Sequence, residues 1–186
     1  STKGWTGHTL GAAGIVEAVG QDVQGVRQGD RIGYFSGPLG SYATHRALDA
    51  DRLVKLPDDL DSETAAAAML KGCTAEFLIE RCARVEPGET VLVHAAAGGV
   101  GSVLVQWLAS IGATVIAHAG TSPKAERAKE LGAHHALCCP MEDLAAQVRA
   151  LTDGKGVSVV FDGVGATSWK ASLASVARKG LVVTYG

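Results

Sequence analysis

The chain has 186 residues, of which 17 are Lys or Arg and 19 are Asp or Glu, so its formal net charge is −2. This balance excludes a strongly basic nucleic-acid-binding protein and a chain dominated by an acidic tail. Hydrophobic residues make up 47% of the sequence and charged residues 19%, so the chain can build a packed core and is not intrinsically disordered.

The first part of the chain has the pattern of a small β domain. Strands are predicted at residues 12–20, at 26–35 with a turn near Gly29, and over 41–57, which reads as one or two strands stopped by Pro57. A further turn is expected at Gly37–Gly40. We place the domain boundary near residue 58.

The composition then changes to an Ala-rich segment at 61–83, which predicts a helix. Either Asp61 or Ser62 can cap its start, because a short side-chain oxygen can accept a free backbone N–H there. Gly72 is expected to split the helix in two, since glycine is a weak helix former.

From residue 90 onwards, predicted strands and helices alternate. This alternation predicts right-handed βαβ units and a doubly wound parallel sheet. The absence of Asp, Glu, Lys and Arg between Thr90 and Pro123 fits strands covered on both faces better than a membrane span. The strands are expected at 90–95, 113–120, 135–139, 156–165 and 181–185, and the helices at 98–112, 122–132, 141–154 and 167–180.

The helix at 122–132 has local start and stop signals. Ser122 is the expected N-cap, Pro123 the first helical residue and Gly132 the C-cap.

A glycine-rich turn between the first of these strands and its helix is the strongest motif. It is a variant of GxGxxG with Ala96, Gly98 and Gly101 in the three positions. Gly98 would let the backbone approach a pyrophosphate, and Gly101 would let the helix pack closely on the strand. The N–H groups of Gly99, Val100 and Gly101 would face the phosphates. The alternative is a packing turn without a ligand.

The stretch from His118 to Lys124 contains no carboxylate that could hold a ribose 2′-hydroxyl, which favours NADP over NAD. Lys124 would then meet the 2′-phosphate, with Arg127 one turn further on sharing the field. The alternative is a solvated surface lysine. Asp162, at the end of a strand, would either touch a ribose or bind backbone N–H groups.

At this point the chain resembles the zinc-free quinone oxidoreductases of the medium-chain dehydrogenase/reductase superfamily, the zeta-crystallin type. It corresponds to a little over half of such a protein, so a truncated member is expected. The resemblance rests on AAGIVEAVG (12–20), GDRI (29–32), GSYATHR (40–46), LVKLPDDL (53–60), AAAMLKGCTA (66–75), GETVLVHAAAGGVGSVLVQW (88–107), KAERAKELGA (124–133) and VVFDGVG (159–165).

The resemblance implies an α/β fold with a partial GroES-like substrate domain over residues 1–57 and an incomplete Rossmann domain over 58–186. It implies hydride transfer from NADPH to quinones or other conjugated carbonyls. We assign no catalytic residue from the sequence. Thr74 and Val164 would lie near the nicotinamide. The implied cofactor-binding residues are Thr74, Ala97, Gly98, Gly99, Val100, Gly101, Gly120, Thr121, Ser122, Lys124, Val164 and Gly165.

No metal site is expected. Gly7-His8 superficially resembles the His-bearing motif of zinc-dependent relatives, but no Cys stands at ligand spacing from it. The four cysteines, Cys73, Cys82, Cys138 and Cys139, form no disulfide pattern, which indicates reduced thiols and a cytoplasmic protein.

The expected partner is a small quinone or enone, with homo-oligomer formation but no nucleic acid and no membrane. Two other functions stay open. One is an enoyl-thioester reductase of the same superfamily. The other is a nucleotide-binding structural protein or an inactive fragment without turnover.

Overall fold

The computed structural model describes residues 11–36 and 40–186, which divide into two compact units, Ser1–Cys73 and Thr74–Gly186. His8 and most of the turn expected at Gly37–Gly40 therefore lie outside the described residues. The division falls inside a helix and comes later than residue 58. The boundary near residue 58 stays a prediction about domain roles.

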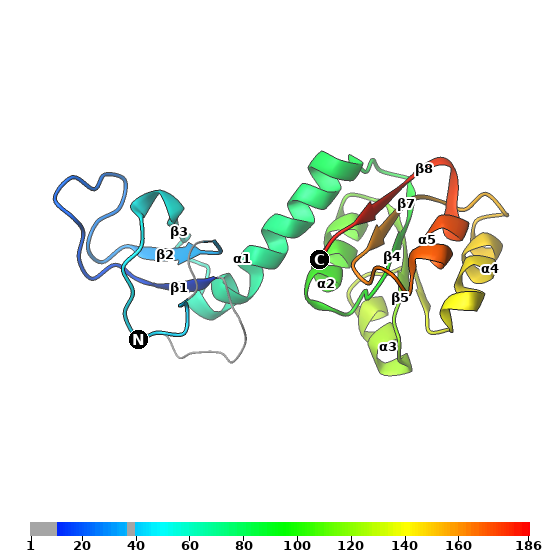
Figure 1. Cartoon of the computed structure of the whole chain (residues 1–186), viewed down its shortest axis with the longest axis horizontal. Coiled ribbons are helices and arrows are strands. Elements are labelled where there is room, and N and C mark those ends of the chain that lie inside the picture. Colours follow the sequence, from blue (N-terminus) through cyan, green and yellow to red (C-terminus); the bar gives the residue numbers. More distant parts are fainter. Residues whose placement is uncertain (1–10, 37–39) are drawn as a thin grey trace. The chain divides into compact units, whose positions relative to one another are not determined.

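The first unit contains a three-stranded antiparallel sheet in the order β1-β2-β3 (Figure 1). Its strands are β1 (Ala12–Ile15), β2 (Arg31–Tyr34) and β3 (Val54–Lys55), with the 3₁₀ helix η1 (Ala50–Arg52) before β3. These strands are shorter than the sequence predicted. The chain between β1 and β2 leaves the sheet after Val16. Two backbone hydrogen bonds close this loop: the Val16 N–H donates to the Asp30 carbonyl at 3.0 Å, and the Gly29 N–H donates to the Val16 carbonyl at 2.9 Å.

Helix α1 (Ser62–Glu76) continues directly into the π-helix η2 (Phe77–Ala83). Asp61 caps it, because its carboxylate accepts the backbone N–H of Thr64 at 2.9 Å. The expected break at Gly72 is wrong. Gly72 sits inside the helix, and a Cβ there would meet nothing within 4 Å. The first half of α1 belongs with the small unit, since a Cβ on Gly33 of β2 would collide with the Met69 side chain.

The second unit is a five-stranded parallel sheet in the order β6-β5-β4-β7-β8 (Figure 1). The chain order reverses at β4, which confirms the doubly wound sheet. The strands are β4 (Thr90–Val93), β5 (Thr114–His118), β6 (His135–Leu137), β7 (Val157–Asp162) and β8 (Val176–Thr184), and the helices are α2 (Gly99–Ser110), α3 (Ser122–Glu130), α4 (Met141–Leu151) and α5 (Trp169–Ser175).

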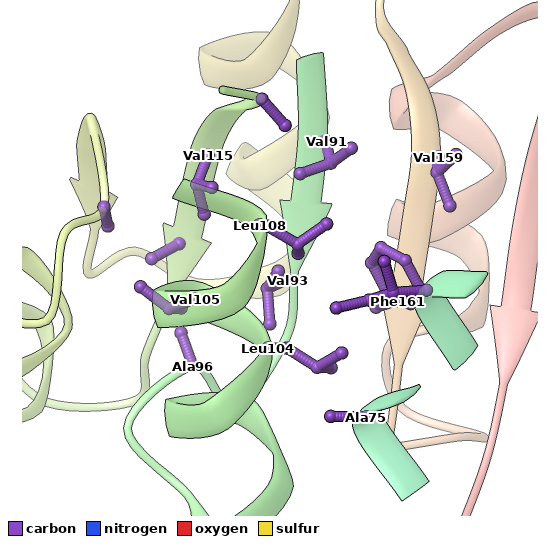
Figure 2. Packing of buried hydrophobic residues seen from close by; sticks show 14 of the residues in the cluster. Ala75, Val91, Val93, Ala96, Leu104, Val105, Leu108, Val115, Val159 and Phe161 are labelled. Atoms are coloured by element: carbon purple, nitrogen blue, oxygen red, sulfur yellow. The ribbon is translucent and has the colours of Figure 1, made fainter. Parts of the chain in front are cut away.

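Two hydrophobic clusters cover the two faces of this sheet. On one face, Val91 and Val93 of β4 and Phe161 of β7 lie with Leu104 and Leu108 of α2 (Figure 2). On the other face, the cluster contains Leu92, Ile116 and Val160 from the strands with Leu144 and Val148 from α4. Burial on both faces explains the long run without charges. In the described part of the chain, no helix is long and apolar enough to cross a membrane.

Three expected boundaries are wrong. The helix expected at 167–180 ends at Ser175, and β8 begins at Val176 rather than at 181. The guanidinium of Arg149 donates to the carbonyls of Ala174 and Val176 at 3.0 Å, so it satisfies acceptors that this helix end leaves free. In α3 the N-cap is Thr121 rather than Ser122, which is already helical.

Candidate functional site

Three loops leave the same edge of the parallel sheet at its centre. The strands β5, β4 and β7 are neighbours, and their register aligns Val93 with Ala117 and with Phe161. The residues that follow each strand therefore emerge side by side at the carboxyl edge. This is the point where the strand order reverses, which is where open α/β sheets bind ligands.

The glycine-rich loop after β4 makes a tight turn before α2. Its entry is fixed by backbone bonds from His94 to the Phe161 carbonyl at 3.0 Å and from Ala96 to the His118 carbonyl at 3.1 Å. Ala95 adopts a left-handed conformation with φ of 47°, and its carbonyl accepts the Gly98 N–H at 2.8 Å. The sequence motif assigned no role to Ala95, because its first position fell on Ala96.

Two glycines of this loop lie against its backbone. A Cβ on Gly98 would come within 3.0 Å of the Ala95 carbonyl oxygen. A Cβ on Gly101 would collide with that same oxygen and lie 2.9 Å from the Ala96 Cα. The close approach of α2 to the turn therefore requires glycine at position 101. The approach of a pyrophosphate at Gly98 stays a prediction.

The N-terminus of α2 has the properties of an anion site. Its N-cap residue, Gly98, has no side chain that could accept the free N–H groups of the first turn. Those donors belong to Gly99, Val100 and Gly101, and no acidic residue lies in the first turn. Ala97, just before the cap, is half-buried. The helix macrodipole adds a positive potential at this end.

The loop after β5 is open. Gly120, Thr121 and Ser122 are exposed, and a Cβ on Gly120 would meet nothing within 4 Å. Lys124 lies exposed in the first turn of α3, and in residues 11–36 and 40–186 no carboxylate forms an ion pair with it. Arg127, in contrast, pairs with Glu130 at 2.9 Å.

The loop after β7 is closed by a buried carboxylate. Asp162 is fully buried, and its Oδ1 accepts the N–H groups of Val164 at 2.9 Å and Gly165 at 3.1 Å. The hydroxyls of Ser168 and Ser172 donate to its Oδ2 at 2.8 and 2.6 Å. Of the two roles open for Asp162, the structure favours the one of binding backbone N–H groups.

These hydrogen bonds keep Asp162 ionised. Burial alone raises the pKa of a carboxyl group, but the donors Ser172, Ser168, Gly165 and Val164 outweigh burial and hold the pKa of Asp162 below its ordinary value. A fixed negative charge therefore lies directly beneath the loop.

A histidine from β4's exit joins this network. The Nε2 of His94 lies 3.0 Å from the Ser172 Oγ, which gives its own proton to Asp162, so His94 is the donor in this contact. Burial lowers the pKa of His94 to about 4, so the ring is neutral at pH 7. The ring of His118 lies edge-on at 5.6 Å, and its Nε2 is 3.0 Å from the Cys139 carbonyl.

The structure thus brings together the turn at 97–101, the β5 exit at 120–124 and the β7 exit at 164–165. Thr74 begins the second unit, and the residue after it, Ala75, lies in the same cluster as Phe161, beyond it towards the carboxyl end of β7 (Figure 2). The roles of these residues towards a cofactor stay predictions. Sequence reasoning missed His94, Ser168 and Ser172. A histidine in an apolar strand and two serines four residues apart were the available signals.

In the described ranges, no group of three His, Cys, Asp or Glu side chains could hold a metal ion. The absence of zinc stays a prediction.

A parallel sheet with an uncapped glycine turn at its switch point is typical of Rossmann-type dinucleotide-binding units. In this chain it follows a small antiparallel unit. A family model described as zinc-binding dehydrogenase matches residues 99–186. A quinone oxidoreductase of Pseudomonas aeruginosa is 44% identical over 174 residues, which cover 94% of this chain and 54% of the relative. A 2-haloacrylate reductase of Burkholderia is 42% identical over 177 residues, which cover 94% and 53%.

Solved structures agree. The Escherichia coli quinone oxidoreductase in complex with NADPH matches with a TM-score of 0.91 at 40% identity, over 95% of this chain and 54% of that one. The CurK enoyl reductase matches with a TM-score of 0.87 at 32% identity, over 95% and 53%. The chain is similar to quinone oxidoreductases over nearly its whole length, and it spans about half the length of the relatives it matches.

Proposed function

We propose that the chain binds NADPH and forms the cofactor-binding part of an oxidoreductase that transfers hydride to quinones or other conjugated carbonyls. One arrangement carries this proposal: the uncapped N-terminus of α2 opens at the switch point of the sheet, between the loops after β5 and β7. A relative of the same fold was solved with NADPH, which supports the choice of cofactor.

The chain's own residues fit a dinucleotide. The N–H groups of Gly99, Val100 and Gly101 would bind the pyrophosphate, and Gly98 leaves the room that a side chain would fill. On the β5 side, Lys124 would bind the 2′-phosphate of the adenosine half, with Gly120, Thr121 and Ser122 beside it. A dinucleotide lies across the switch point, so the nicotinamide half falls over β7, near Val164 and Gly165.

The bound cofactor supplies the hydride, and the protein supplies orientation and exclusion of water. Little acid or base chemistry is required from this unit, so we assign no catalytic residue to it. Ala97 and Thr74 would complete the walls of the site.

An enoyl-thioester reductase is the second candidate, because the CurK enoyl reductase has the same fold at 32% identity. The higher identity to quinone oxidoreductases favours the first. NADPH oxidation with a naphthoquinone and with a crotonyl thioester separates the two. Turnover with neither, together with NADPH binding, would instead indicate a nucleotide-binding protein without activity.

We further propose a cytoplasmic protein acting on a small molecule, without nucleic acid or membrane partners, and able to form homo-oligomers. All four cysteines are free, and Cys73, Cys82 and Cys138 are exposed, which suits a reducing compartment. The net charge of −2 offers no general attraction to nucleic acid.

NADPH binding by this chain is the direct test. Titration followed by NADPH fluorescence should give saturable binding that competes with NADP⁺. A folded chain that binds neither would overturn the proposal.

A further inference from the structure

The loop after β7 has an unusual support for so short a segment. Two consecutive backbone N–H groups, those of Val164 and Gly165, converge on one oxygen of Asp162 at 2.9 and 3.1 Å. Gly165 has a φ of 90°, which few other residues adopt, and Val164 is 42% exposed. The backbone of the loop is thus fixed from below while its outer side stays open.

The carboxylate is itself held in one orientation. The Ser168 hydroxyl lies 2.7 and 2.8 Å from the two oxygens of Asp162, and the Ser168 backbone N–H returns to the Gly165 carbonyl at 3.0 Å. Ser172, one turn further along α5, donates to Oδ2 and is tied to His94. All four side-chain groups come from buried residues.

The charge on Asp162 is held by hydrogen bonds. In the described ranges, no Lys, Arg or His forms an ion pair with it. Burying a carboxylate on hydrogen bonds alone is a costly way to close a loop, because desolvation opposes it. The loop supported at this cost is the one that, under the proposed function, would face the nicotinamide half of the cofactor.

We propose that Asp162 is a positioning residue, which fixes the Val164–Gly165 backbone against the nicotinamide half of the cofactor. This inference rests on the proposed function. It predicts that Asp162 matters for NADPH but not for a ligand that ends at the phosphates of the adenosine half.

The test compares NADPH with adenosine 2′,5′-bisphosphate, which carries the 2′-phosphate but no nicotinamide. Both are titrated against the wild-type chain and against Asp162→Ala. We expect the Kd for NADPH to rise about tenfold, in line with the loss of two charge-assisted hydrogen bonds to the loop, while the Kd for the bisphosphate stays within about twofold. Asp162→Asn should recover most of the affinity, since its amide oxygen can still accept both N–H groups.

Thr152→Val is the matched control. Its Oγ1 accepts the Gly156 N–H at 2.9 Å, so it supports the same strand in the same way at the opposite edge of the sheet. This variant should lower stability without changing either Kd. If Asp162→Ala does not fold, Ser168→Ala releases one restraint on the carboxylate and should weaken NADPH selectively by about threefold.

The positioning role would be overturned if a folded variant bound both ligands equally more weakly, or if folded Asp162→Ala or Ser168→Ala bound NADPH as tightly as the wild type. Either result would leave the proposed NADPH-binding function standing. A wild-type chain that binds neither ligand would overturn the proposed function and this role with it.

Discussion

The two loops that flank the glycine turn are built in opposite ways. After β5, Gly120 to Lys124 lie exposed, and the Ser122 hydroxyl makes a weak contact with the Cys138 Sγ at 3.9 Å. After β7, the backbone N–H groups of Val164 and Gly165 donate to the fully buried carboxylate of Asp162. The comparison teaches that one end of the site can select its ligand by charge at an open surface, while the other fixes geometry through buried hydrogen bonds.

Removing the glycine turn should disable both ends at once. Gly98→Val places a branched side chain where the phosphates would lie, and its Cβ lies 3.0 Å from the Ala95 carbonyl oxygen. We expect NADPH affinity to fall by at least about a hundredfold, or ~2.7 kcal/mol. Calorimetry with the folded variant measures this, with Gly72→Ala in α1 as control because that position is open. Unchanged affinity would show that the turn does not bind the cofactor.

Charge at the open end should decide between the two nicotinamide cofactors. Lys124→Ala is expected to weaken NADPH about ten- to thirtyfold and to leave NADH nearly unchanged. The NADPH effect should shrink at high salt, because the side chain is exposed. The measured quantity is the ratio of the two dissociation constants.

Lys129→Ala, near the other end of α3, is the matched control for charge. If Lys124→Ala weakens both cofactors equally, then Lys124 acts on folding or on the start of α3 and not on the 2′-phosphate.

Acid should destabilise the fold through the buried polar network beneath the β7 loop. The pKa of His94 is lowered from 6.5 to about 4 in the folded chain, so the unfolded chain binds the extra proton first. The free energy of unfolding should therefore fall as the pH drops from 6.5 towards 4, by up to about 1.4 kcal/mol per pH unit. Asp162 has a lowered pKa, and its contribution is lost only at still lower pH.

Urea unfolding at pH 7, 6 and 5 measures this slope. His94→Gln, whose amide can still donate to Ser172 but does not titrate, should show a flatter profile. The same slope in both proteins would mean that another group takes up the proton.

The end of α5 should affect stability and not the site. Arg149 donates to the carbonyls of Gly154, Ala174 and Val176, and lysine cannot reproduce that fork. Arg149→Lys is expected to cost about 1 kcal/mol of stability, with an unchanged Kd for NADPH. Thermal unfolding measures the loss of stability, and an NADPH titration measures the Kd. A weaker affinity for NADPH would show that the position of α5 affects cofactor binding at the loop after β7.

The sequence predicts the sheet and the turn because both depend on local patterns. Apolar runs such as Val91–Val93 identify buried parallel strands, and Gly98 with Gly101 identifies the tight entry to a helix. The sequence does not predict the buried hydrogen-bond network around Asp162. Ser172 and His94 are 78 residues apart, and nothing in either segment shows that they meet. The end of α5 depends in the same way on Arg149 from another helix, so helix propensity alone carried the expected helix on to residue 180.

Polar groups form a row beneath the three loops: the backbone carbonyl of Cys139, then the side chains of His118, His94, Ser172 and Asp162. The row crosses β5, β4 and β7, so the loops that follow these three strands are supported by the same connected set of polar groups. A ligand that steadies any one of them should slow backbone opening in all three. In hydrogen exchange, the amides of Ala96, Ala119 and Val164 should then gain protection together, and at similar ligand concentrations.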